Sequence, residues 1–307
     1  MEFESIDYVL GSQKLPVDEL SPKIGISVLE KIKNKSGIQS IRICNESEDA
    51  IILAQKLIEK SENFKKILTS DLIIVVSESK KSPIPPISSY ILHKLGTLEN
   101  TIVLDIDSGC AGYVQALQIV DSFFQNSLFK NGIIITTDSY SKYIEKDDRS
   151  VSPIFGDGAS ITFLKNDNHT SIKSFHNGSD MKKFNFLQTK SNAGNKLKMI
   201  GSEVFMFVKK NIPSSVHKCL SQGSLNIEEI DYFCFHQASK LVIDELRKNL
   251  NISEKKSPFL IKETGNLVST SIPFLLHSFI NELRGKKIIL SGFGVGLSWA
   301  TILMDLK

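Results

Sequence analysis

The chain has 307 residues, of which 41% are hydrophobic and 23% are charged. This composition is typical of a globular protein with a substantial core and argues against a disordered chain. The length predicts one large unit or two medium ones. A formal net charge of +3 argues against a nucleic-acid partner, because such proteins usually carry a concentrated basic face.

The N-terminal residues MEFESIDYVL lack the basic segment of a signal peptide. No apolar run approaches the roughly 18 residues that a membrane span needs. The four cysteines form no CxxC pair and show no zinc-like spacing, so we expect no thiolate metal site. We therefore expect a cytoplasmic protein without membrane association, in which one cysteine could be reactive.

Short apolar segments alternate with longer segments of helical periodicity. Strands are predicted at residues 71–77, 101–106, 132–136, 160–164, 231–235, 287–290 and 299–304. Helices are predicted at residues 47–60, 87–95, 111–125, 203–220, 239–250 and 269–283. Most of these strands are continuously apolar, which is typical of strands covered on both faces. The alternation predicts a layered α/β fold.

The chain contains a faint internal repeat with a separation of about 155 to 160 residues. DLIIVVSES (71–79) is similar to DYFCFHQAS (231–239), and the helical segments that open at Cys110 and Asn266 follow in the same order. We therefore expect two similar halves, residues 1–166 and 167–307, that meet in the turn-like stretch 166–170. Coincidence among Ile-rich strands is the alternative.

The sharpest local motif is a predicted strand that ends at DSG, followed by a helix that opens at Cys110. A cysteine at a helix N-terminus faces unpaired N–H groups and the positive end of the helix dipole, which favours the thiolate. Gly109 and Gly112 leave room for a substrate carbonyl to approach the sulfur. Cys110 is therefore a candidate nucleophile; the alternative is a small buried residue at a tight turn.

Two other polar residues follow the same pattern. His236 comes directly after an apolar strand, where open α/β sheets place their ligands, although a buried core histidine would also fit. Asn266 precedes a helix, where it could be a simple cap. Because the repeat gives Cys110 and Asn266 equivalent positions, we expect these three residues to share one site. The glycine-rich turn 292–296 suits an oxyanion hole, and no helix follows it to hold a dinucleotide.

Five segments together resemble a known family: DSGCAGYVQAL, IFGDGAS, FHQAS, ETGNLVSTSIP and GFGVGLSW. In this order they are similar to β-ketoacyl-acyl-carrier-protein synthase III of the thiolase superfamily, and the likeness extends over nearly the whole chain. The resemblance implies an α/β fold of the thiolase-like, five-layered αβαβα type, built from two duplicated halves. It also implies a homodimer.

The resemblance further implies a decarboxylative Claisen condensation. Cys110 would take the acyl group from acyl-CoA or acyl-carrier protein, with the backbone N–H groups of Cys110 and Val295 as the oxyanion hole. His236 and Asn266 would stabilise the enolate formed from malonyl-acyl-carrier protein. CoA or phosphopantetheine thioesters are then substrates, and the resemblance implies no cofactor and no metal.

The family pattern also marks substrate-binding positions and departures from them. Phe205 falls where the family lines its pantetheine tunnel, and Ile84 falls where it closes the acyl pocket; a core role for either is equally compatible. The expected cationic contacts to substrate are Lys35, Arg149 and Lys240. Positions that hold an aromatic residue or an arginine in the familiar enzymes are here Lys31, Lys35, Gln39 and Leu241. Because lysine cannot stack as arginine does, we expect a specialised paralogue in polysaccharide or secondary metabolism.

Two alternatives remain at the level of the sequence. An acyltransferase could move the acyl group from Cys110 to an amine or a hydroxyl without decarboxylation, and the retained Asn266 argues against it. A non-catalytic partner of a condensing enzyme would be expected to lack the nucleophile, and Cys110 is present.

Overall fold

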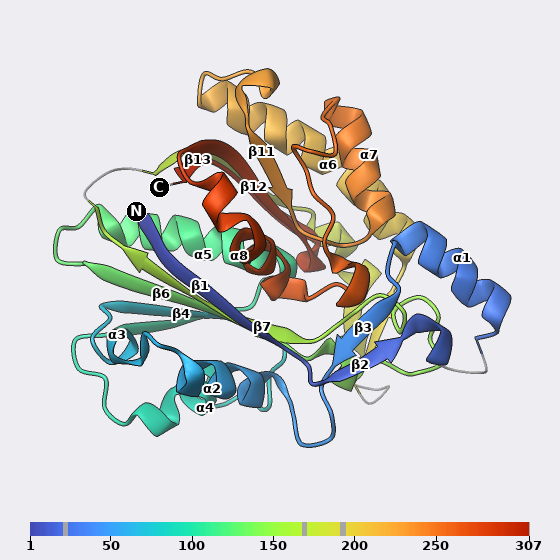
Figure 1. Ribbon diagram of the computed structural model, residues 1–307, viewed down its shortest axis with the longest axis horizontal. Coiled ribbons are helices and arrows are strands. Elements are labelled where there is room, and N and C mark those ends of the chain that lie inside the picture. The colour runs from blue at the N-terminus through green and yellow to red at the C-terminus, as the bar shows by residue number, and fades with distance from the viewer. Residues whose placement is uncertain (21–23, 168–170, 191–194, 307) are drawn as a thin grey trace.

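The computed structural model describes residues 1–20, 24–167, 171–190 and 195–306. Two β-sheets lie on either side of a central pair of helices, and further helices cover the outer face of each sheet (Figure 1). The order of layers is therefore α, β, α, β, α. This confirms the five-layered fold that the resemblance implies.

The first sheet contains strands in the order β1 (Glu2–Leu10), β7 (Gly158–Lys165), β6 (Asn131–Asp138), β4 (Leu72–Val76) and β5 (Ile102–Ile106). β4 runs parallel to both β5 and β6, while β7 is antiparallel to β6 and to β1. All five residues of β4 are buried, as its continuous LIIVV run predicts. Helices α2 (Ala50–Lys60) and α4 (Ile87–Leu92) cover the outer side of this sheet.

The second sheet contains strands in the order β11 (Tyr232–Phe235), β12 (Lys286–Gly294), β13 (Ser298–Leu306) and β8 (Ile172–Ser179). β11 is parallel to β12, and the other pairs are antiparallel. Helices α6 (Gly201–Gln222) and α7 (Lys240–Leu250) cover its outer side. The side chain of Ser239 caps α7 by accepting from the Val242 N–H, which fixes where the helix begins after β11.

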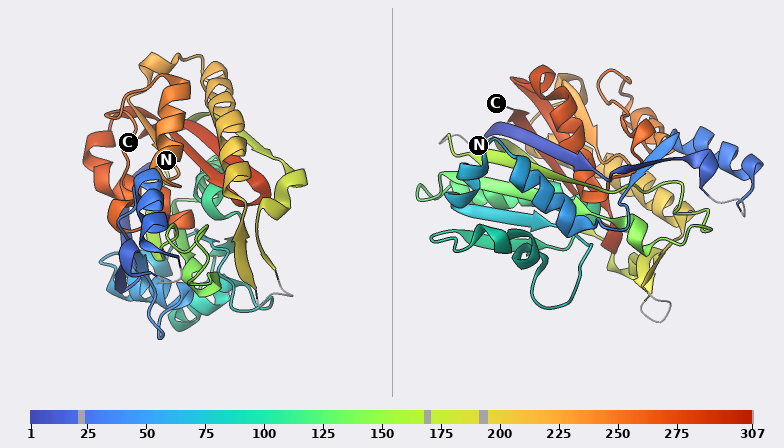
Figure 2. Two further views of the ribbon diagram at one scale, coloured as in Figure 1. Left: turned by 90° about the vertical axis from the view of Figure 1, so that its right-hand side faces the viewer. Right: turned by 60° about the horizontal axis from the view of Figure 1, so that its bottom comes forward.

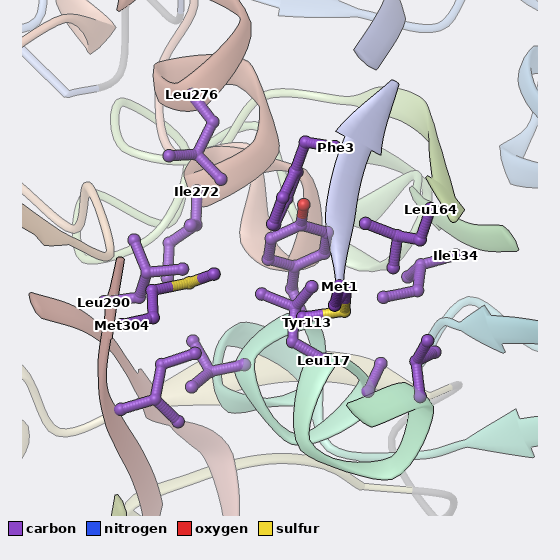
Figure 3. Close-up of a cluster of buried hydrophobic side chains, with 14 of the residues drawn as sticks. Met1, Phe3, Tyr113, Leu117, Ile134, Leu164, Ile272, Leu276, Leu290 and Met304 are labelled. Atoms are coloured by element: carbon purple, nitrogen blue, oxygen red, sulfur yellow. The ribbon is translucent and has the colours of Figure 1, made fainter. Parts of the chain in front are cut away.

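The central layer consists of α5 (Gly109–Phe124) and α8 (Ser271–Leu283). Apolar side chains from both helices meet residues of both sheets there, as Figure 3 shows for Tyr113, Leu117, Ile272 and Leu276. A helix covered on both sides must be apolar over most of its circumference, and α5 buries ten of its residues. This packing fixes the N-terminal end of α5 between the two sheets.

The two sheets repeat one topology. The run β4, α5, β6, β7 corresponds to β11, α8, β12, β13, with the same parallel and antiparallel pairings. The first sheet takes its strands from residues 2–165 and the second from residues 172–306. This correspondence supports the inferred halves 1–166 and 167–307. Their division stays an inference, and residues 168–170 of the expected turn lie outside the described residues.

The remaining strands and α-helices were not expected from the sequence pattern. Besides β1 and β8 they are β2 (Gln13–Pro16), α1 (Ile26–Ser36), β3 (Ser40–Ile43), α3 (Phe64–Leu68), β9 (Leu187–Lys190) and β10 (Lys196–Met199). Helix α1 stands at one end of the molecule and contacts α7, as Figures 1 and 2 show. None of the described helices is long and apolar enough to cross a membrane.

β5 departs from the expectation that the strands are covered on both faces. It lies at the edge of the first sheet and pairs only with β4. Its residues Ile102 and Val103 are 39% and 36% exposed. The apolar sequence therefore predicts the strand correctly, but β5 lies at the edge of the sheet within one chain and not at its centre.

Candidate active site

Cys110, His236 and Asn266 line one cavity of about 250 Å³. Cys110 is the second residue of α5, His236 directly follows β11, and Asn266 lies in the loop before the 3-10 helix Val268–Thr270. The three side chains are 6%, 2% and 4% exposed. The structure thus brings together the three residues that the sequence singles out, one from the first half of the chain and two from the second.

The glycine-rich turn at the end of β12 packs directly against Cys110. A Cβ atom at Gly294 would lie 3.1 Å from the Cys110 Sγ, and one at Gly292 would lie 2.4 Å from the Cys110 carbonyl oxygen. Only glycine allows the backbone to come this close. Val295, where the resemblance implies an oxyanion-hole N–H, directly follows Gly294.

The Cys110 thiol is less acidic than its position at a helix N-terminus predicts. Burial raises the pKa of Cys110 well above its ordinary value, and the negative charges of Glu78 and Asp138 raise it further. Burial and these two charges therefore oppose the thiolate that the helix end favours.

His236 is held as a neutral imidazole. Burial lowers its pKa to about 3. Its Nδ1 lies 2.6 Å from the Ser271 Oγ, and the Gln237 N–H donates to the same oxygen at 3.3 Å. The Ser271 hydroxyl can donate to Nδ1 while its oxygen accepts from that backbone N–H; we assign it as this donor, which places the ring proton on Nε2. The Phe293 ring packs edge-on against the imidazole at 5.4 Å between centroids.

Asn266 is fixed through both its side chain and its backbone. Its Oδ1 accepts from the Val268 N–H at 2.9 Å, which leaves the Nδ2 amide as the donor available to the cavity. Its backbone N–H donates to the Ile154 carbonyl at 2.8 Å, and its carbonyl accepts from the Gly156 N–H at 2.9 Å. The IFGDGAS segment of the first half therefore positions this residue of the second half.

Phe205, Lys35 and Arg149 line the same cavity, as the sequence predicts for substrate contacts. Lys35 and Arg149 are exposed, and neither forms an ion pair with a described residue. A largely apolar cavity with cations at its opening suits a ligand with a long uncharged stem and an anionic group. Within the described ranges, no group of three or more His, Cys, Asp or Glu side chains could hold a metal ion.

The structure does not bring Lys240 or Ile84 to the cavity. Lys240 pairs with Asp244 on the surface of α7, although its neighbours Ser239 and Leu241 do line the cavity. Ile84 is 84% exposed and lies outside the cavity of its own chain. Their roles stay predictions.

Sequence reasoning missed two polar residues near Cys110, Glu78 and Tyr140. Glu78 follows β4 by two positions, and its Oε2 accepts from the Tyr140 hydroxyl at 2.7 Å. Burial raises the pKa of Glu78 to about 7. A signal was present, because Glu78 is a charged residue just past a fully apolar strand. Parallel neighbours β4 and β5 end at the same sheet edge, close to the start of α5.

Known proteins match this chain over its length. The family model for 3-oxoacyl-[acyl-carrier-protein] synthase III matches residues 104–181, and the model for its C-terminal part matches residues 220–306. A β-ketoacyl-[acyl-carrier-protein] synthase III from Acholeplasma laidlawii is 32% identical, with 90% of this chain and 89% of the relative covered. One from Lactococcus lactis is 30% identical, with 94% of each covered.

A solved structure of a 3-oxoacyl-(acyl-carrier protein) synthase from Burkholderia xenovorans has the same fold. It superposes with a TM-score of 0.90 at 26% identity, and 99% of this chain and 93% of that chain are covered. The resemblance carried by the five sequence segments is thus confirmed at the level of both sequence and fold. The chain is an acyltransferase-type enzyme that belongs to the β-ketoacyl-[acyl-carrier-protein] synthase III family.

Proposed function

We propose that this enzyme joins an acyl thioester to malonyl-acyl-carrier protein by decarboxylative Claisen condensation, with Cys110 carrying the acyl group. The observation that supports this most strongly is one cavity that contains a thiol and two neutral hydrogen-bond donors. A thiol can hold an acyl group covalently, and paired donors can stabilise an enolate oxygen. Fatty acid biosynthesis uses this reaction to form carbon–carbon bonds.

In the first half-reaction, the Cys110 sulfur attacks the carbonyl of acyl-CoA or acyl-carrier protein. The negative charge that develops on the carbonyl oxygen is stabilised by the backbone N–H groups of Cys110 and Val295. The close approach of Gly294 to the sulfur supports this assignment, because it brings the following peptide next to the reacting atom. The acyl group then remains on Cys110 while the thiol of the donor leaves.

In the second half-reaction, the His236 Nε2–H and the Asn266 Nδ2–H donate to the thioester oxygen of the malonyl group. Charge accumulates on that oxygen as CO2 leaves, so donors fixed in advance lower the barrier. A neutral His236 remains a donor at physiological pH. The resulting carbanion attacks the acyl–Cys110 thioester and releases a β-ketoacyl product. Loss of CO2 drives the reaction, so this scheme needs neither a metal nor a redox cofactor.

Substrate binding follows from the walls of the cavity. We propose that Phe205 packs against the phosphopantetheine stem and that Lys35 and Arg149 bind its phosphate. Lys240, one residue from the cavity wall, is proposed to contact the acidic carrier protein at the surface. The expected place in specialised metabolism stays a prediction. We propose a cytoplasmic location, because the four cysteines are free thiols and Cys110 must stay reduced to react.

We further propose a homodimer formed through the free edge of the first sheet. An edge strand with exposed apolar residues is ready to pair with another chain, and β5 carries Ile102 and Val103 there. Two copies of β5 in antiparallel pairing would form a symmetric interface. Ile84 precedes α4, which packs on β5, so in this dimer Ile84 would close the acyl pocket of the partner subunit.

The dimer is tested by placing a charge on each candidate edge. Val103→Asp should give a monomer in size-exclusion chromatography with light scattering. Phe175→Asp is the matched control, because Phe175 is 55% exposed on β8, an edge strand of the second sheet. A dimer that survives Val103→Asp would overturn the proposed interface.

The condensation itself is tested by product analysis. Purified enzyme is supplied with acyl-CoA or acyl-carrier protein, together with malonyl-acyl-carrier protein or with amine and hydroxyl acceptors. We expect a β-ketoacyl-carrier protein and one CO2 per turnover. Acylated amine or alcohol without CO2 release would replace condensation by simple acyl transfer.

A further inference from the structure

Glu78 lies against the residue that precedes Cys110. A Cβ atom at Gly109 would lie 3.2 Å from both the Cδ and the Oε2 of Glu78, and 3.0 Å from the Val295 Cγ1. The carboxyl group therefore stands beside the N-terminal end of α5, next to the turn that carries Val295. β4 brings it there, although Glu78 is far from Cys110 in the sequence.

Two contacts hold this carboxyl group in place. The Glu78 N–H donates to the Asp138 Oδ1 at 2.9 Å, and the Tyr140 hydroxyl donates to the Glu78 Oε2 at 2.7 Å. No Lys or Arg of the described chain forms an ion pair with Glu78, since the nearby Lys80 pairs with Asp107. A buried carboxylate without a cation costs stability, and a function in the site would explain why a glutamate is present here.

Glu78 and Cys110 influence each other electrostatically. The charge of Glu78 raises the pKa of the Cys110 thiol, and burial raises the pKa of Glu78 itself to about 7. Two negative charges this close disfavour each other, so above the pKa of Glu78 the pair carries one charge, on the carboxylate, and one proton, on the thiol. The titratable and charged groups that face Glu78 are Cys110, Tyr140, Asp107, Asp138 and Lys80.

His236 cannot take the thiol proton in its place. In the assigned tautomer, the Nδ1 lone pair accepts from Ser271 and the Nε2 carries the ring proton, so neither nitrogen has a lone pair to offer. Burial also holds the pKa of His236 at about 3, far from what a proton acceptor at neutral pH requires. A proton acceptor for Cys110 must therefore lie elsewhere in the site.

We propose that Glu78 accepts the proton of Cys110 when the acyl group is transferred to the enzyme, and that Tyr140 is a positioning residue for its carboxylate. The inference rests on the proposed function, because it requires Cys110 to be the nucleophile. It adds Glu78, as a proton acceptor, to the catalytic residues Cys110, His236 and Asn266.

The proton and electron balance closes without another reactant. As the sulfur–carbon bond to the acyl group forms, the S–H bond breaks and its proton passes to the Glu78 carboxylate. The carbonyl electron pair moves to oxygen, returns, and expels the thiolate of the donor. That thiolate takes the proton back from Glu78 and leaves as a thiol, which restores the carboxylate for the next turnover.

The first test is the single-turnover rate at which acetyl-CoA, butyryl-CoA or octanoyl-CoA adds an acyl mass to Cys110. For the wild type, this rate should rise with pH to a plateau with a midpoint near 7, because only ionised Glu78 accepts a proton. Glu78→Gln should be about 100-fold slower above the midpoint and should lose the midpoint. Tyr140→Phe keeps the acceptor, so its plateau should persist while the midpoint moves to higher pH.

A second measurement separates proton transfer from structural damage. Alkylation of Cys110 by iodoacetamide depends on the thiolate fraction, which the charge of Glu78 suppresses. Glu78→Gln should therefore alkylate several-fold faster at about pH 8 while it acylates more slowly. A disturbed site would slow both reactions, and this outcome would overturn the inference.

The two proposals fail in different ways. If no acyl-CoA or acyl-carrier protein acylates Cys110 in the wild type, the proposed function fails and this inference fails with it. If the wild type is acylated and Glu78→Gln keeps its rate and midpoint, only the role of Glu78 is overturned. Thermal unfolding of each variant checks that it is folded.

Discussion

The His236 Nδ1 and the Ser271 Oγ are 2.6 Å apart, which links the end of β11 to the first residue of α8. With the Ser271 hydroxyl assigned as the donor to Nδ1, this contact leaves the Nε2–H as the donor of the ring. Without the Ser271 hydroxyl, the proton would distribute over both nitrogens and the ring would lose its anchor. The donor on which enolate stabilisation depends is thus set by a residue that touches no substrate.

Ser271→Ala should slow the decarboxylation of malonyl-acyl-carrier protein about ten-fold, the effect of one lost hydrogen bond. Acylation of Cys110 should change little, because that step does not use His236. The measurement is CO2 release against acyl-enzyme formation. Ser278→Ala is the matched control, since that hydroxyl only bonds the Phe274 carbonyl within α8. Equal loss of both steps would argue against a role through His236.

Asn266→Asp separates the two functions of the amide. The aspartate keeps an oxygen for the Val268 N–H but loses the Nδ2 donor. It also adds a negative charge where the enolate forms. We expect decarboxylation to fall about 100-fold while acylation of Cys110 persists. Measured CO2 release at the wild-type rate would contradict the role of the Asn266 amide in stabilising the enolate.

Gly294→Ala should block acylation. The added Cβ would lie 3.1 Å from the Cys110 Sγ and 3.0 Å from its Cβ, in the space where the tetrahedral intermediate forms. We expect acyl-enzyme formation, followed by intact mass, to fall about 100-fold. The comparison variant is Gly201→Ala, whose Cβ meets only the Met199 Cε at 3.9 Å. Similar loss in both variants would mean that the defect is not specific to the turn at Cys110.

Glu78→Gln should stabilise the folded protein at alkaline pH. Burial raises the pKa of Glu78 from 4.5 to about 7, so between these values the folded state holds a proton that the unfolded chain releases. The free energy of unfolding therefore falls as pH rises through this window. Above it, the folded wild type carries the full cost of the buried charge, up to about 3 kcal/mol.

The uncharged glutamine avoids this cost. The unfolding temperature of the variant should therefore exceed that of the wild type by several degrees at about pH 8. Near pH 4.5 the two unfolding temperatures should be nearly equal. Scanning calorimetry at both pH values measures the difference. A shift of the same size at both values would mean that the charge of Glu78 is not its source.

The three cavity residues could be predicted because each follows a strand or opens a helix in a repeated topology. Continuous apolar runs such as Leu72–Val76 identified buried strands correctly. β1 escaped because its EFESIDYVL sequence is polar at several positions, as suits an outer strand whose side chains are only partly buried. A pattern search for apolar runs does not detect such a strand.

The acidity of Cys110 could not be predicted from its local sequence. The helix N-terminus is a local feature of the sequence. The charge of Glu78, which opposes it, lies near Cys110 because β4 and β5 pair in parallel and end at the same edge of the sheet. The same holds for Ile84 and Lys240. The resemblance predicts that both contact substrate, but neither lines the cavity of a single chain.

The central claim is that Cys110 holds an acyl group that a malonyl-derived carbanion then removes. The most direct measurement is the intact mass of the enzyme after incubation with acyl-CoA or acyl-carrier protein, followed by addition of malonyl-acyl-carrier protein. We predict one added acyl mass that maps to Cys110, that Cys110→Ser abolishes, and that disappears with release of CO2 and a β-ketoacyl product. An acyl mass that persists in Cys110→Ser, or that malonyl-acyl-carrier protein does not remove, would contradict the account.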